Sequence, residues 1–159
     1  MKIQKIHPCL WFDDQAEDAA KHYVSIFARS KITRVSRYGE GGMGKPGSVM
    51  LVDFQLDGLR LSALNGGPHF KLTPAISLSV SCETQKEVDT LWRKLVKGGK
   101  PSRCGWLEDR FGLSWQIVPE VLPRLMRDRN PAKVMAVTQA MLTMVKLDSA
   151  KLQRAYDRA

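Results

Sequence analysis

Residues 7–23 read HPCLWFDDQAEDAAKHY, and this stretch decides the fold of the first half of the chain. Residues 3–12 have a strand-like apolar and polar alternation, which predicts a β-strand. An aspartate at position 13 or 14 can then cap a helix that runs to about residue 27 with an apolar stripe on one face. The strand should present two faces, one with Ile6, Leu10 and Phe12 and the other with His7, Cys9 and Trp11.

Three more strands are predicted after this helix, over residues 32–38, 48–56 and 59–65. The last two flank Asp57-Gly58, which is a strong signal for a tight hairpin turn. The first part of the chain therefore reads as a strand, a helix and three further strands, a βαβββ unit.

The same order restarts about 70 residues later. Residues 75–81 predict a strand, and Thr84 with Glu87 forms a capping box for a helix that ends at Gly98 and Gly99. Short strands follow over residues 100–104, 105–108 and 113–118. The repeat predicts an α+β fold in which residues 1–119 hold two βαβββ modules, at about 3–66 and 74–119.

Residues 120–159 form a different kind of segment. Asn130 before Pro131 and, later, Asp148 are good helix caps, so we expect a C-terminal helical extension. We expect this extension to pack on the paired modules or on a dimer partner.

Composition excludes several classes of protein. A chain of 159 residues with 43% hydrophobic residues can form a folded core, and its apolar runs fall far short of a membrane span. The N-terminus has no signal-peptide pattern and the three cysteines are an odd number, so we expect a cytoplasmic protein with free thiols. The net charge of +9 is spread along the chain. That distribution favours a basic surface over a nucleic-acid site.

The loop at residues 38–49, YGEGGMGKPGSV, contains the G-x-x-x-x-G-K spacing of a phosphate-binding loop. Such a loop must lead into a helix whose amides bind phosphate, and a Ser or Thr must follow the lysine. Here Pro46 follows Lys45 and a strand comes next. We therefore interpret the segment as a glycine-rich connection between two strands.

Several segments in order resemble the PhnB-like proteins of the vicinal oxygen chelate superfamily, which includes glyoxalases, fosfomycin-resistance proteins and extradiol dioxygenases. The matching segments are HPCLWFDDQAEDAAKHY, GKPGSVMLVDFQLDG, LSALNGGPHFK, SCETQKEVDTLW, CGWLEDRFGLSWQIVP and AMLTMVKLDSAKLQRAY. The resemblance implies curved mixed sheets that surround a cavity, and a homodimer. Some members are labelled demethylubiquinone methyltransferases, but the chain has no glycine-rich cofactor loop that supports this label.

The resemblance also implies a ligand cavity for a small oxygen-bearing molecule. We expect apolar walls from Trp11, Phe54 and Trp106, and polar contacts from His7, Cys9, Asn65, Ser77, Ser79 and Gln116. Metal-dependent members hold a divalent ion at four positions. Here His7 and Gln116 match two of them, whereas the others offer only Ala75 or Ser77 and Asn65. The metal site is therefore degenerate and should bind a divalent ion weakly at most.

Other chemistry has less support in the sequence. Cys9 and His7 share a strand face and could act as nucleophile and base, but a buried structural thiol is the simpler interpretation. Asp53 and Asp57 lack a His and a Ser partner at a readable spacing, and Glu108-Asp109 resembles a solvated turn. Two functions stay open: metal-assisted isomerisation, addition or oxygenation, and non-catalytic binding of a small molecule.

Overall fold

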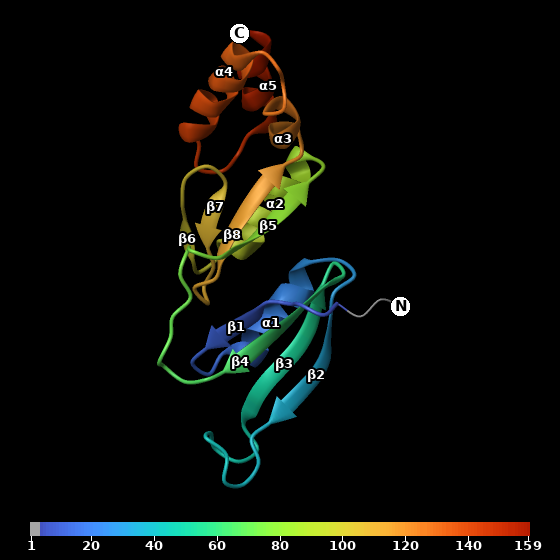
Figure 1. Cartoon of the computed structure of the whole chain (residues 1–159), viewed down its shortest axis with the longest axis vertical. Coiled ribbons are helices and arrows are strands. Elements are labelled where there is room, and N and C mark those ends of the chain that lie inside the picture. Colours follow the sequence, from blue (N-terminus) through green and yellow to red (C-terminus); the bar gives the residue numbers. More distant parts are fainter. Residues whose placement is uncertain (1–3) are drawn as a thin grey trace. The chain divides into compact units, whose positions relative to one another are not determined.

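The computed structural model describes residues 4–159 and separates into two units, divided between Leu72 and Thr73. The first unit contains, in chain order, β1 (Cys9–Phe12), α1 (Ala16–Ile26), β2 (Lys31–Arg37), β3 (Val49–Leu56) and β4 (Leu59–Asn65) (Figure 1). Its open sheet has the order β1-β4-β3-β2, with β1 parallel to β4 and the other pairs antiparallel. The predicted βαβββ order is confirmed, although the predicted strand start at Ile3 lies outside the described residues.

Helix α1 covers one face of this sheet, and the side chains between the helix and the sheet form the core of the first unit. Ala16, Ala19 and Ala20 are fully buried, and small side chains of this kind let a helix approach a sheet closely. The Tyr23 ring lies 6.3 Å from the Phe54 ring, centroid to centroid. Burial of these apolar groups is the main source of stability in the unit.

The predicted faces of the first strand are correct for Leu10 and Phe12, which are both buried. Ile6 is 89% exposed, because the strand begins only at Cys9. Phe54 was expected in a cavity wall beside Trp11, and this prediction is wrong. Phe54 pairs with Leu61 and is 1% exposed in the core under α1, on the opposite face of the sheet.

Helix α1 is capped by a residue that is distant in sequence. Neither Asp13 nor Asp14 caps it; instead the Ala16 N–H donates to Asn65 Oδ1 at 2.8 Å. The Asn65 amide also donates to the Val49 carbonyl at 3.1 Å. The end of β4 therefore fixes the start of α1.

Two connections in the first unit follow the sequence closely. Asp57 and Gly58 have φ angles of 44° and 91°, as a two-residue turn with positive φ at both positions requires. The loop between β2 and β3 is closed by hydrogen bonds between Tyr38 and Ser48 (2.9 Å) and between Gly47 and Tyr38 (2.8 Å). The interpretation of this loop as a strand-to-strand connection is confirmed.

The second unit begins with the same order of elements: β5 (Ser77–Cys82), α2 (Gln85–Leu95), β6 (Lys100–Pro101), β7 (Trp106–Glu108) and β8 (Ser114–Pro119). Its open sheet has the order β5-β8-β7-β6. The predicted Thr84 cap is present, since the Glu87 N–H donates to Thr84 Oγ1 at 3.2 Å. The return bond differs from a standard capping box, because Glu87 Oε2 accepts at 2.9 Å from the N–H of Glu83, one residue before the cap.

The turn between β7 and β8 is built around a buried carboxylate. Asp109 is 2% exposed and accepts hydrogen bonds from the Phe111 N–H (2.8 Å), the Leu113 N–H (3.1 Å) and the Trp115 indole (2.8 Å). The prediction of a solvated Glu108-Asp109 turn is therefore wrong for Asp109. Buried N–H donors need acceptors, and here one side chain satisfies three of them.

The C-terminal helices are α3 (Val121–Leu125), α4 (Pro131–Leu142) and α5 (Ser149–Asp157). The predicted caps are present, as Asn130 and Asp148 accept from backbone N–H groups at 3.0 and 2.9 Å. These helices share a buried core of Leu122, Leu125, Val137, Met144, Leu147 and Leu152. Two backbone hydrogen bonds of 2.8 Å, from Cys104 to Met144 and from Gly105 to Val145, tie them to the second sheet. Among the described residues, no helix combines the length and apolar character that a membrane crossing requires.

Candidate functional site

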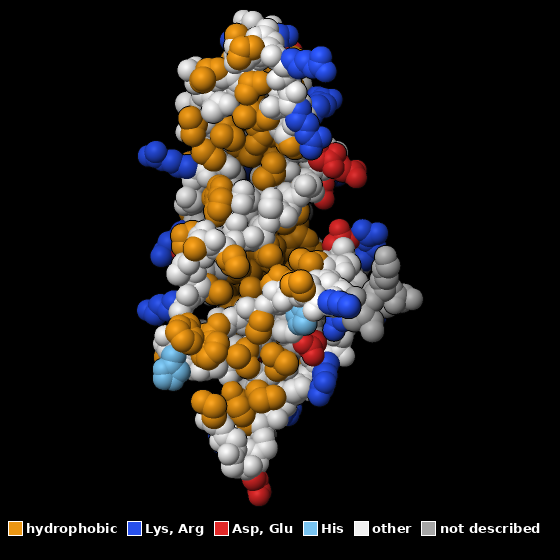
Figure 2. Space-filling model, viewed as in Figure 1, with side chains coloured by type: hydrophobic (Ala, Val, Ile, Leu, Met, Phe, Trp, Pro, Cys, Tyr) orange, Lys and Arg blue, Asp and Glu red, His pale blue; other side chains and the backbone are white. Residues whose placement is uncertain are grey.

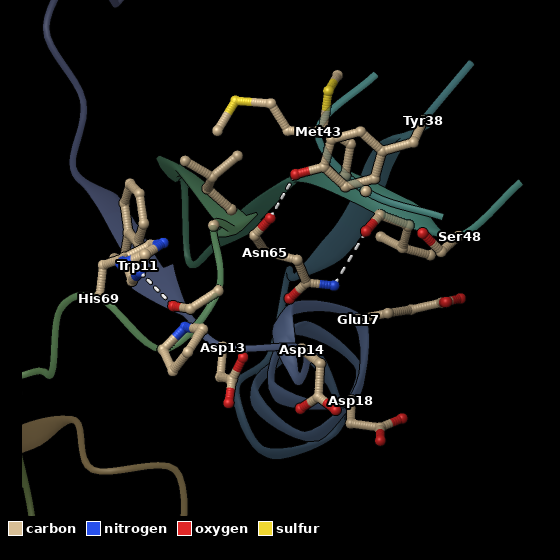
Figure 3. Close-up of a pocket in the computed structure, with 17 residues that line it drawn as sticks. Trp11, Asp13, Asp14, Glu17, Asp18, Tyr38, Met43, Ser48, Asn65 and His69 are labelled. Carbon is tan, nitrogen blue, oxygen red and sulfur yellow. Dashed lines mark hydrogen bonds between the residues drawn. The ribbon is translucent and has the colours of Figure 1, made fainter. Parts of the chain in front are cut away.

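A pocket of about 820 Å³ opens in the first unit, where β1 and β4 end and α1 begins (Figure 3). The loop between β2 and β3 contributes Met43, Gly44 and Ser48 to its lining. Asn65 and His69 also line it. A pocket of this size can take a small organic molecule.

Aromatic rings form one side of the pocket. The Trp11 indole donates to the Gly67 carbonyl at 2.9 Å, and its ring meets Phe70 edge-on at 5.0 Å between centroids. A Cβ atom on Gly66 would lie 2.2 Å from the Trp11 ring, so only glycine permits this approach. Tyr38 is fixed by a 2.7 Å hydrogen bond to the Asn65 carbonyl. The rings are therefore held in place before any ligand binds.

Carboxylates form another side of the pocket. Asp13, Asp14, Glu17 and Asp18 line it around the first turn of α1, as Figure 3 shows. Lys21 lies 2.9 Å from Glu17, and its hydrogen bond lowers the pKa of the Glu17 carboxyl. A negative wall in a chain of net charge +9 attracts cations and hydroxyl donors and repels anions.

A second polar cluster lies on the sheet face opposite α1. His7 Nε2 lies 3.2 Å from Ser62 Oγ, and Ser62 donates to Asp53 Oδ1 at 2.6 Å. The sheet register places Cys9, Ser62 and Asp53 in one row across β1, β4 and β3. Asp53 thus has a Ser partner and, through it, a His, although the sequence shows neither at a readable spacing. The order is His–Ser–Asp, so the serine lies between the other two and is not the nucleophile of a Ser–His–Asp triad.

Cys9 does not have the features of an activated nucleophile. Partial burial raises the pKa of its thiol, and the Asp53 carboxylate raises it further. A reactive cysteine needs the opposite shift, because the thiolate is the attacking species. The expected buried structural thiol is also wrong, since Cys9 is exposed on the sheet face opposite α1.

The second unit has a row of neutral side chains at the positions that correspond to Cys9, Ser62 and Asp53. The register places Ser79, Gln116 and Trp106 side by side across β5, β8 and β7. The Gln116 amide donates to Ser77 Oγ at 2.9 Å. His7 lies two positions before Cys9 and contacts Ser62 on the neighbouring strand. Ser77 lies two positions before Ser79 and contacts Gln116 in the same diagonal way.

The expected cavity residues fall into separate groups. His7, Cys9, Trp11 and Asn65 belong to the first unit, and the second unit holds Ser77, Ser79, Trp106 and Gln116. The Asn65 side chain is used in capping α1. Sequence reasoning missed Ser62, Tyr38 and the acidic wall. The Asp57-Gly58 turn could have identified Ser62, because a two-residue hairpin places position 53 opposite position 62.

A resident divalent ion, which the superfamily resemblance implies, requires several donors around one point. His7 Nε2 already contacts Ser62, and the Gln116 amide donates to Ser77. Within residues 4–159, no group of three or more His, Cys, Asp or Glu side chains could hold a metal ion. The described residues therefore do not fit such a site.

Paired βαβββ modules with helix-covered open sheets define the fold of the vicinal oxygen chelate superfamily. The chain belongs to the PhnB-like family within it. The family model that matches residues 4–118 is described as 3-demethylubiquinone-9 3-methyltransferase. No curated protein sequence matches the chain.

Solved structures support the same assignment. A putative 3-demethylubiquinone-9 3-methyltransferase, the PhnB protein of Bacillus cereus, is 38% identical over 73% of this chain and 99% of its own, with a TM-score of 0.68. A Pseudomonas aeruginosa protein is 19% identical over 74% of this chain and 98% of its own, with a TM-score of 0.63. A fosfomycin resistance protein from Listeria monocytogenes, a mutant complexed with Mn(II) and 1S,2S-dihydroxypropylphosphonic acid, is 16% identical over 72% of this chain and 90% of its own (TM-score 0.50). The last two likenesses concern the fold alone.

Proposed function

We propose that the protein binds a small, partly apolar molecule with hydroxyl or amino groups in the pocket of the first unit. The observation that supports this proposal is the combination of fixed aromatic rings and carboxylates around one cavity of about 820 Å³. Trp11 and Tyr38 offer ring faces to an apolar or cationic group. Asp13, Asp14 and Asp18 accept hydrogen bonds from hydroxyl and ammonium groups.

The charge of the pocket restricts the ligand. A phosphonate or carboxylate would lie close to several carboxylates of the same sign, which costs free energy at low ionic strength. A neutral or cationic ligand avoids this repulsion. The proposed ligand therefore differs in charge from the phosphonic acid named for the Listeria protein.

The test uses three probes of similar size: phenethylamine, phenethyl alcohol and phenylacetate. Titrations followed by tryptophan fluorescence at low salt should give about tenfold tighter binding of the amine than of the acid, about 1.4 kcal/mol. Trp11→Phe should remove the fluorescence response, and Trp92→Phe, on α2 of the second unit, should retain it.

Tightest binding of phenylacetate would contradict the charge argument. A full response in the Trp11→Phe variant, or no response to any probe, would contradict the pocket itself. Asp14→Asn with Asp18→Asn should reduce the preference for the amine and leave binding of the alcohol nearly unchanged.

We favour non-catalytic binding over the family's other activities. Methyl transfer through a Rossmann-type cofactor site would need a glycine-rich turn between the first strand and helix. Here Asp13-Asp14-Gln15 forms that connection. Metal-assisted isomerisation, addition or oxygenation stays a prediction of the family resemblance, and a weakly bound divalent ion would be its cofactor.

We also propose a homodimer in the cytoplasm. Large apolar side chains are exposed on α4, where Met135 (56%) and Leu142 (57%) are seven residues apart and share a helix face. Figure 2 shows hydrophobic side chains grouped on the visible face of the C-terminal helices. The cysteines are free, which suits a reducing compartment.

A further inference from the structure

We propose that His7, Ser62 and Asp53 form a hydrogen-bond relay that presents the His7 ring as an acceptor for a ligand hydroxyl. The residues come from the segment before β1, from β4 and from β3, so the folded sheet brings them together. This site is distinct from the acidic pocket, because none of the three residues lines that pocket. It also does not depend on the proposed function.

Counting protons fixes the direction of the relay. Ser62 is 4% exposed and has one hydroxyl proton, and its oxygen lies 2.6 Å from Asp53 Oδ1 and 3.2 Å from His7 Nε2. A carboxylate has no proton to donate, so the hydroxyl proton points to Asp53. The Ser62 oxygen must then accept from His7, and Nε2 carries the ring proton. A neutral His7 is therefore the Nε2–H tautomer, with its lone pair on Nδ1.

The exposure of the three residues shows which end of the relay meets solvent. Ser62 is buried and Asp53 is half-buried, whereas His7 is exposed. Asp53 also raises the pKa of the Cys9 thiol, after the larger effect of partial burial, as a carboxylate on the same face should. Nδ1 is thus the accessible acceptor of the relay.

An acceptor nitrogen discriminates between ligands by their hydrogen-bond donors. It favours an alcohol, phenol or enol over the corresponding ether, which has no O–H to donate. The family resemblance implies that His7 occupies the first metal-ligand position. In the relay its role is different, because its ring holds a proton on one nitrogen and offers the other to a ligand.

The tautomer can be measured by long-range ¹H–¹⁵N correlation NMR at about pH 8.5, where histidine rings are ordinarily neutral. The wild type should have the smallest fraction of Nδ1–H at His7. Ser62→Ala removes the acceptor and should give the mixture of a free imidazole. Asp53→Ala frees the serine proton for Nε2, so this variant should have the largest Nδ1–H fraction.

The double variant Ser62→Ala, Asp53→Ala should match Ser62→Ala, because Asp53 acts only through the serine. His22 and His69 are internal references whose tautomers should not change. If Asp53→Ala does not fold, Asp53→Asn offers an amide donor to Ser62 and should shift the tautomer in the same direction. Equal Nδ1–H fractions in wild type, Ser62→Ala and the folded Asp53 variant would overturn the relay.

The hydroxyl site has its own test with phenol and anisole, which differ by a methyl group on the oxygen. Phenol should shift the His7 Nδ1 resonance in the wild type, and anisole should shift it far less. Equal shifts, or no shift with phenol at concentrations up to its solubility, would overturn the assignment of Nδ1 as an acceptor for a ligand hydroxyl.

Discussion

Asp109 makes the β7–β8 turn depend on a single side chain. Its carboxylate is buried and accepts from two backbone N–H groups and from the Trp115 indole. Asp109→Ala would leave these donors without this acceptor, so we expect the unfolding free energy to fall by about 3 kcal/mol. Urea unfolding followed by tryptophan fluorescence measures the change.

The neighbouring residue is a matched control for this prediction. Glu108 is half-exposed and lies 3.8 Å from Lys100, a weak surface ion pair. Glu108→Ala should change the unfolding free energy by less than about 0.5 kcal/mol. Similar losses for both variants would show that the turn tolerates removal of the buried acceptor.

At the scale of single residues, the sequence predicts the partners that local geometry determines. The diagonal contact of His7 with Ser62 depends on the parallel register of β1 and β4, which no local pattern shows. Asp109 is similar, because its burial depends on Trp115 folding back over the turn. Contacts made across strands or turns are therefore the ones that sequence reasoning missed.

At the scale of elements, Gln85 links α2 to the C-terminal helices. Its amide donates to the Leu147 carbonyl at 3.1 Å, and its oxygen accepts from the Ser149 N–H and hydroxyl, both at 2.8 Å. Gln85→Ala should lower the unfolding free energy by about 2 kcal/mol. Amide exchange in α5 should also become faster, as hydrogen-exchange mass spectrometry can measure. Unchanged α5 exchange would contradict this role.

The same junction predicts a pH dependence. Hydrogen bonds from Lys146 first, and then from Gln85, lower the pKa of the Asp89 carboxyl. A lowered folded-state pKa contributes stability above the ordinary Asp value of about 4, and this contribution is lost as the pH falls through the folded value. Exchange of α5 amides, corrected for intrinsic rates, should therefore be independent of pH between about 5 and 7 and faster below about 4. Lys146→Ala is the control, because it removes the largest cause of the lowered pKa and should reduce this acid sensitivity.

Helix starts show which elements could be predicted. Thr84, Asn130 and Asp148 cap the helices that immediately follow them, and each was identified from sequence. Helix α1 differs, since its cap comes from Asn65 at the end of β4. A cap contributed by another element has no local signature, so the acidic residues before α1 were assigned a role that they do not have.

At the scale of the whole molecule, we expect a homodimer without a stoichiometric metal. Native mass spectrometry of protein purified without chelators should give the mass of two chains and far less than one divalent ion per chain. The physical reason is the donor set, in which the His7 and Gln116 side chains are already hydrogen-bonded. One tightly held Zn, Ni, Mn or Fe per chain would contradict this prediction, and a monomer at micromolar concentration would contradict the dimer.

The order of elements was the most predictable property of the molecule. Alternation and turn residues predicted two βαβββ modules followed by helices, and the family match covers residues 4–118. The acidic pocket was not predicted, because it combines strand ends, a helix start and a loop that are separated by up to about fifty residues. Sequence patterns describe each of these segments but not the cavity that they enclose.

The diagonal contact found in both modules offers a route to protein engineering. The two modules share the strand register and the diagonal contact but have different side chains there, so the second is a neutral template for the first. Ser77→His, Gln116→Ser and Trp106→Asp would place the side chains of His7, Ser62 and Asp53 at the corresponding register positions. A transplanted histidine with the same tautomer would mean that the βαβββ scaffold, rather than the local sequence, encodes the relay.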